Sequence, residues 1–172
     1  AALRDAKAHG CKVLSIVNVV GSSIARESDA VLYTWAGPEI SVATTKAYSC
    51  QLTVFYLLAL KFAQIRSAIT PDTFQTLLTA LKQLPDQMEG LLSQKEKIQF
   101  FANHYLATEH IFFMGRGIDY AISMEGSLKL KEISYIHSEA YAAGELKHGT
   151  ISLMEEGTLV VALATQDTLY PK

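Results

Sequence analysis

Residues 110–149 read HIFFMGRGIDYAISMEGSLKLKEISYIHSEAYAAGELKHG, and the architecture of the chain can be worked out from them. The stretch opens with a short apolar run at residues 110–114, which is typical of a buried strand. Gly115-Arg116-Gly117 follows as a turn, and a helix is expected beyond it. A strand, a turn and a helix in this order form the repeating unit of a parallel α/β sheet.

A weak repeat of the same unit lies nearer the N-terminus. Residues 1–9 predict the end of a helix, and residues 12–17 and 30–35 predict strands on either side of a turn segment. Residues 158–164 predict the last strand. Strands that alternate with helices favour parallel pairing through right-handed crossovers. We therefore expect an α/β fold, doubly wound and Rossmann-like, with helices flanking parallel sheets. Each half has too few strands for a complete domain of this kind.

The middle of the chain predicts three helices. Gly37-Pro38-Glu39 suits a helix start, because proline fits the first helical position and an early glutamate complements the positive helix end. This helix is expected to continue to residue 65. A second should begin at Pro71 and stop before Pro85, which lacks a backbone N–H, and a third should cover residues 86–106.

A charged stripe is expected on the helix after the glycine turn. At about 100° per residue, Glu125, Lys129 and Glu132 project within roughly 60° of one another. On the same helical wheel, four apolar residues lie beside the stripe: Ile118, Ile122, Leu128 and Ile136. Ser123 and Ser127 point in other directions. A solvated stripe would contribute only about 0.2–0.5 kcal/mol per pair. Because burying charge is costly unless the charges pair or are used, the apolar neighbours favour a functional stripe.

Composition narrows the classes of function. The chain has 172 residues, 49% of them hydrophobic, which is enough for one domain or two small ones with a core. A net charge of −2 leaves no basic excess for nucleic acid or an anionic membrane surface. The apolar stretch at residues 52–63 is too short for a membrane span. Cys11 and Cys50 lack metal-ligand spacing, so we expect buried free thiols in a reducing compartment.

Ligands of doubly wound sheets bind beyond the carboxyl ends of the strands, which here are near Ser22 and Ser23 in one half and near Arg116 in the other. The turn at residues 115–117 and the helix N-terminus after it could hold a phosphate. However, its glycines lack the spacing of a dinucleotide fingerprint or a P-loop, so a plain strand-to-helix turn fits equally well.

Four segments together resemble the sugar isomerase (SIS) portion of the glutamine–fructose-6-phosphate aminotransferase (isomerising) family: NVVGSSIARESD at 18–29, GPEISVATTKAY at 37–48, GRG at 115–117 and LKLKEISYIHSEAYAAGELKHG at 128–149. The resemblance covers essentially the whole chain. It implies tandem SIS domains that are incomplete at both ends. Residues 1–66 would be the later part of the first domain, 67–107 connecting helices and 108–172 the earlier part of the second.

The resemblance also implies an activity. The family converts fructose 6-phosphate and glutamine to glucosamine 6-phosphate and glutamate, without a cofactor or a metal. A glutaminase domain and a serine- and threonine-rich phosphate loop would precede this chain, and a tail lysine would follow it. We therefore expect a cytoplasmic homodimer that binds neither nucleic acid nor membrane, and we expect these 172 residues alone to be inactive.

By position, Glu132 matches the family's proton-transferring base, Lys129 its neighbour and His148 the group that opens the sugar ring. An apolar environment raises the pKa of a carboxylate and a nearby lysine opposes that shift, whereas a histidine titrates near neutrality. The family places this histidine in its neighbour's active site, which implies composite sites in a dimer. Glu145, Lys147 and His137 are expected to be structural.

Glu39, Val42 and Thr44 match positions that line the family's sugar pocket, and Arg116 is the candidate at the phosphate turn. Glu39 fits a plain helix-start role equally well. Ser41 and Thr150 depart from the glycine and the proline that are common in the family, although neither change removes a reacting group.

Two other functions fit the same residues. A sugar-phosphate deaminase or deglycase of the same fold would keep a base like Glu132 but would not use glutamine. A sugar-phosphate-binding regulatory module would need hydroxyls and a positive turn, but it would have no use for Glu132 and His148 together.

Overall fold

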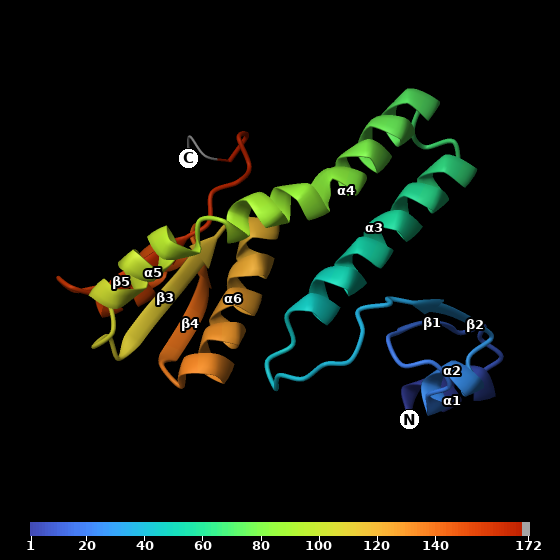
Figure 1. Cartoon of the computed structure of the whole chain (residues 1–172), viewed down its shortest axis with the longest axis horizontal. Coiled ribbons are helices and arrows are strands. Elements are labelled where there is room, and N and C mark those ends of the chain that lie inside the picture. The colour runs from blue at the N-terminus through green and yellow to red at the C-terminus, as the bar shows by residue number, and fades with distance from the viewer. Residues whose placement is uncertain (170–172) are drawn as a thin grey trace. The chain divides into compact units, whose positions relative to one another are not determined.

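The computed structural model describes residues 1–169, and the chain divides into two compact units between residues 92 and 93 (Figure 1). The first unit contains α1 (Ala2–Ala8), β1 (Leu14–Val17), α2 (Ser23–Glu27), β2 (Ala30–Tyr33), α3 (Lys46–Ile65) and α4 (Pro71–Leu92). The second contains α5 (Lys95–His104), β3 (His110–Gly115), α6 (Ile118–Ser134), β4 (His137–Ala142), the 3₁₀ turns η1 (Leu146–His148) and η2 (Thr150–Leu153), and β5 (Leu159–Ala162).

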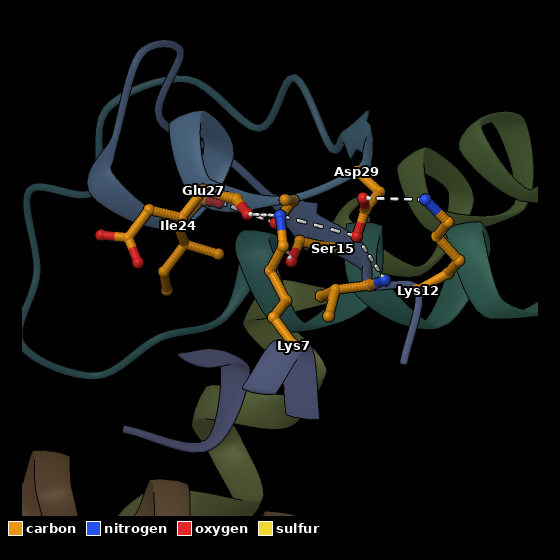
Figure 2. Close-up of polar contacts among 8 residues, drawn as sticks. Lys7, Lys12, Ser15, Ile24, Glu27 and Asp29 are labelled. Atoms are coloured by element: carbon orange, nitrogen blue, oxygen red, sulfur yellow. Dashed lines mark hydrogen bonds and ion pairs between the residues drawn. The ribbon is translucent and has the colours of Figure 1, made fainter. Parts of the chain in front are cut away.

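Parallel strands form the sheet of the first unit, as the sequence predicts. β1 pairs with β2 from Leu14 opposite Ala30 to Val17 opposite Tyr33. The segment expected to be a turn contains the short helix α2, whose N-cap is the side chain of Ser22. Polar contacts near the start of β1 involve Asp29, which lies 3.7 Å from Lys7 Nζ and 3.6 Å from Lys12 Nζ (Figure 2).

Asp29 fixes the first residues of β1. Its carboxylate accepts a 2.9 Å hydrogen bond from the backbone N–H of Val13. That hydrogen bond, helped by Lys7 and Lys12, holds the pKa of Asp29 below its usual value. Ser15 makes a second tie to this connection, since its hydroxyl lies 2.7 Å from that of Ser28.

The predicted helix start at residues 37–39 is wrong, because α3 begins only at Lys46. Side chains hold the carbonyls of this segment away from a helical pattern. Asn18 Nδ2 donates to the Gly37 carbonyl at 2.6 Å, and Lys46 Nζ donates to the Pro38 carbonyl at 2.6 Å. Gly37 also has φ +72°, which lies outside the helical region. Glu39 is therefore a loop residue.

The predicted break at Pro85 is also wrong, because α4 continues through it to Leu92. Leu84 and Gln87, on either side of the proline, both line an apolar groove shared with α3. Packing along the helix therefore outweighs the loss of one backbone hydrogen bond. The helices separate only at residues 93–94, before α5.

The sheet of the second unit has the order β4-β3-β5, and both pairings are parallel. β3 and β5 confirm two predicted strands, and α6 packs against β3 and β4 (Figure 1). The sequence did not predict β4. Its residues, HSEAYA, are too polar to show the apolar run of a buried strand.

Small and polar side chains form the face of α6 that is most deeply buried. Asp119, Ser123 and Ser127 are buried, whereas Ile118, Ile122 and Leu128 are exposed. The expected apolar face is therefore wrong. A Cβ on Gly115 would lie 2.4 Å from the carbonyl carbon of Asp119, so only small groups fit where the helix meets the strand.

Replacing Gly115 with alanine should destabilise the fold by about 1–3 kcal/mol, because the new methyl group overlaps the backbone of α6. Urea unfolding of the chain measures this cost. Gly144→Ala is the matched control. Its added Cβ would lie 3.6 Å from the Arg116 guanidinium, an ordinary contact, so its cost should stay within about 0.5 kcal/mol. Equal stability of the two variants would contradict the close approach.

Two buried serines should respond differently to alanine. Ser123 Oγ is buried and has no hydrogen-bond partner within the described residues, so Ser123→Ala should be neutral or stabilising. Ser138 Oγ lies 2.8 Å from Ser127 Oγ and donates to the Ser127 carbonyl at 2.8 Å. Ser138→Ala should therefore cost about 1–3 kcal/mol. The same unfolding measurement compares them, and a larger loss at Ser123 would contradict these contacts.

Candidate functional site

A charged triad on α6, made of Glu125, Lys129 and Glu132, is the first part of the candidate site. Lys129 Nζ donates to Glu132 Oε2 at 2.5 Å and lies 3.6 Å from Glu125 Oε1. The three side chains are only 24%, 18% and 31% exposed, respectively. The predicted stripe is therefore confirmed as a paired and partly buried group of charges.

Lys129 is held as a cation by this arrangement. The hydrogen bond to Glu132 raises the pKa of Lys129 above its usual value, the charges of Glu132 and Glu125 add to the effect, and partial burial opposes it. A lysine that stays protonated stabilises the carboxylate beside it. Glu132 keeps part of its surface exposed, so it remains reachable by a small molecule and can accept a proton.

His148 lies in η1, in the loop that follows β4. The loop is anchored by the buried side chain of Leu146 and by the Glu145 N–H, which donates to the Ala142 carbonyl at 2.8 Å. The imidazole is 63% exposed, and its Nε2 lies 3.9 Å from Glu145 Oε2. Among the residues that the structure describes, the His148 side chain is therefore paired with Glu145 and not with the charged triad. A structural role was expected for Glu145, and its side chain lies near His148 rather than near Lys147.

Arg116 lines a cavity of about 250 Å³ at the carboxyl ends of β3 and β5. The chain leaves β3 towards β4 on one side and returns to β5 on the other, so this crevice is the switch point where such sheets bind ligands. The Arg116 carbonyl accepts a 2.8 Å hydrogen bond from Gln166 Nε2. Its guanidinium lies next to Gly144, in the loop that leads to His148.

Asp119 lines the same cavity, and sequence analysis did not single it out. Its side chain is almost fully buried and accepts from the Thr165 backbone N–H at 2.9 Å and from Thr165 Oγ1 at 2.5 Å. These bonds lower the pKa of Asp119. The sequence signal that could have identified Asp119 is an acidic residue directly after the glycine turn. Asp119 fixes the loop beyond β5, so it shapes the cavity.

Glu39 lines a hollow of about 630 Å³ in the first unit, at the carboxyl ends of β1 and β2. Asn18 and Trp35 line it as well. Val42 is 94% exposed and Thr44 is half-buried, and neither of them lines this hollow. The structure thus brings Glu39 to the predicted edge of the sheet, while Lys129, Glu132, His148 and Arg116 belong to the other unit.

Cys11 is exposed and Cys50 is half-buried, so the expectation of two buried thiols is wrong, although both cysteines are free. Within residues 1–169, no three His, Cys, Asp or Glu side chains come close enough together to hold a metal ion. Over the same residues, none of the helices combines the length and the apolar character that crossing a membrane requires.

Parallel sheets with polar groups gathered at the carboxyl ends of their strands define a class of α/β domain that binds small ligands at that edge. The family model of the SIS domain matches residues 1–61 and 105–172, and the chain belongs to this family.

Among curated proteins, the glutamine–fructose-6-phosphate aminotransferases (isomerizing) of Caldanaerobacter subterraneus subsp. tengcongensis and Clostridium acetobutylicum are 59% and 56% identical over all 172 residues. The chain spans 28% of the length of each. Among solved structures, the C-terminal domain of glucosamine-fructose-6-phosphate aminotransferase from Francisella tularensis is 38% identical. It aligns with a TM-score of 0.95, over 99% of this chain and 48% of that one.

Acid should remove the stabilising contribution of Asp119. Its pKa is lowered in the folded state, so this contribution is present above its ordinary value of 3.8 and is lost as the pH falls through the lower folded value. Asp119→Ala should therefore lower the melting temperature at pH 7, and the difference from the unmodified protein should shrink below about pH 4. Thermal unfolding from pH 7 to pH 2 measures this. A difference that stays constant across that range would contradict the role of the carboxylate.

Proposed function

We propose that this chain is the sugar isomerase portion of an enzyme that converts D-fructose 6-phosphate and L-glutamine to D-glucosamine 6-phosphate and L-glutamate. The observation that carries the proposal is the Lys129–Glu132 ion pair, in which a lysine fixes the position of a carboxylate that is only partly exposed. The 59% identity over the whole chain to an aminotransferase of that name supports the same reaction.

Glu132 is the proposed base of the isomerisation. After the sugar ring opens and nitrogen enters at C2, a proton must move between C1 and C2 to leave an aldose. One carboxylate that reaches both carbons can take the proton from one and return it to the other. Lys129 fixes the position of the Glu132 carboxylate through the 2.5 Å hydrogen bond.

His148 is the proposed ring opener, because an imidazole can donate and accept a proton near neutral pH. Its side chain projects into solvent from an anchored loop and pairs only loosely with Glu145. This exposure supports a role in the active site of a second subunit, and hence a homodimer with composite sites.

Glu39, Val42, Thr44 and Arg116 are the proposed sugar-phosphate contacts. The positions of Glu39 and Arg116, each in a hollow at a carboxyl strand edge, support this assignment. The family model's match to residues 1–61 and 105–172 supports two SIS segments, at residues 1–66 and 108–172, joined by helices at 67–107. A glutaminase domain of the same polypeptide would supply ammonia, and the two free thiols fit a cytoplasmic enzyme.

Glu132→Gln in the full-length protein should reduce formation of glucosamine 6-phosphate by at least about 10²-fold, because the amide cannot accept the proton. Binding of fructose 6-phosphate, measured by calorimetry, should change little. Glu156→Gln is the matched control, since Glu156 is exposed in the same unit and should retain full turnover. Unchanged turnover in Glu132→Gln would overturn the assignment. Sugar-phosphate binding without turnover in the unmodified protein would favour a regulatory module instead.

A further inference from the structure

We infer that Asn18 is a positioning residue that holds the loop after β2, including Glu39, in the conformation that binds the sugar phosphate. The inference rests on the proposed function. Asn18 directly follows the last residue of β1, and β1 lies beside β2 in the parallel sheet. Its side chain therefore stands at the edge where the loop leaves the neighbouring strand.

Both halves of the Asn18 amide bind this one loop. Oδ1 accepts from Thr34 Oγ1 at 3.1 Å and from the Ala36 backbone N–H at 2.9 Å. Nδ2 donates to the Gly37 carbonyl at 2.6 Å. Three hydrogen bonds to three residues within a four-residue stretch fix the path of the backbone just before Glu39.

The loop needs such an anchor because its backbone is strained. Trp35 has φ +53°, a left-handed conformation that residues other than glycine rarely adopt, and Gly37 has φ +72°. Conformations of this kind persist only where surrounding contacts over-determine them. The indole of Trp35 is largely exposed and meets Tyr33 at a ring-centroid distance of 5.6 Å, so it contributes little packing of its own.

The amide contributes through the loop rather than through the ligand. Asn18 lines the same hollow as Glu39, yet its oxygen and one N–H are already engaged by backbone and hydroxyl groups. Without these bonds the loop would populate its binding conformation only part of the time, and the apparent affinity falls by that fraction. Once substrate is bound, the proton-transfer groups of the second unit are unchanged. The expected signature is therefore a higher KM with kcat preserved.

The test compares three variants of the full-length enzyme by steady-state kinetics with fructose 6-phosphate. Asn18→Ala should raise KM by about tenfold and leave kcat within about twofold. Thr34→Val keeps the shape of the side chain, removes one of the three bonds and should raise KM by a smaller factor in the same direction. It provides a second readout if Asn18→Ala folds poorly.

Ser15→Ala is the matched control, because it removes a 2.7 Å hydrogen bond from the same strand to a different connection (Figure 2). It should leave KM unchanged even if the melting temperature falls. An unchanged KM in both Asn18→Ala and Thr34→Val, or an equal rise in Ser15→Ala, would overturn the inference while the proposed function stands. An unmodified enzyme that forms no glucosamine 6-phosphate would overturn the proposed function and the inference with it.

Discussion

The close approach of α6 to the end of β3 is the constraint on which the second unit depends. Gly115 has no Cβ, so the backbone of α6 can come close to the end of β3. The helix then contacts the sheet through the buried residues Asp119, Ser123 and Ser127. The buried face of α6 is thereby taken by small and polar groups. The charged triad occupies another side of the same helix, where Lys129 and Glu132 pair within a partly exposed surface.

This constraint explains which features the sequence could predict. The strands β1, β2, β3 and β5, the helix after the glycine turn and the spacing of the triad follow from local periodicity, which needs no knowledge of neighbours. The identity of the buried face of α6 does not follow from local periodicity. A wheel built on hydrophobicity favours Ile118 and Ile122, whereas the distance between backbones selects serine and glycine.

Tertiary contacts also account for the elements that local signals assign wrongly. Gly37-Pro38-Glu39 has the composition of a helix start, but Asn18 and Lys46 capture its carbonyls from outside the segment. β4 carries a histidine, a serine, a glutamate and a tyrosine, and parallel pairing with the central strand β3 makes it a strand despite this polarity. The position of Arg116 at a strand end was predictable from topology, whereas Glu39 was named only through the family resemblance, and the exposure of Val42 was not predicted.

Both units secure their carboxyl edges in the same way. A polar side chain just beyond one strand captures the loop that leaves the adjacent parallel strand, and each takes one threonine hydroxyl and one backbone N–H. Asn18 binds Thr34 and Ala36 after β2, and Asp119 binds both groups of Thr165 after β5. The chemistry of the two differs in one respect. The amide also donates and does not titrate, whereas the carboxylate only accepts and loses its charge in acid. The bonds that Asn18 makes to the loop beside Glu39 therefore do not depend on its own charge, whereas those that Asp119 makes to the loop after β5 weaken in acid.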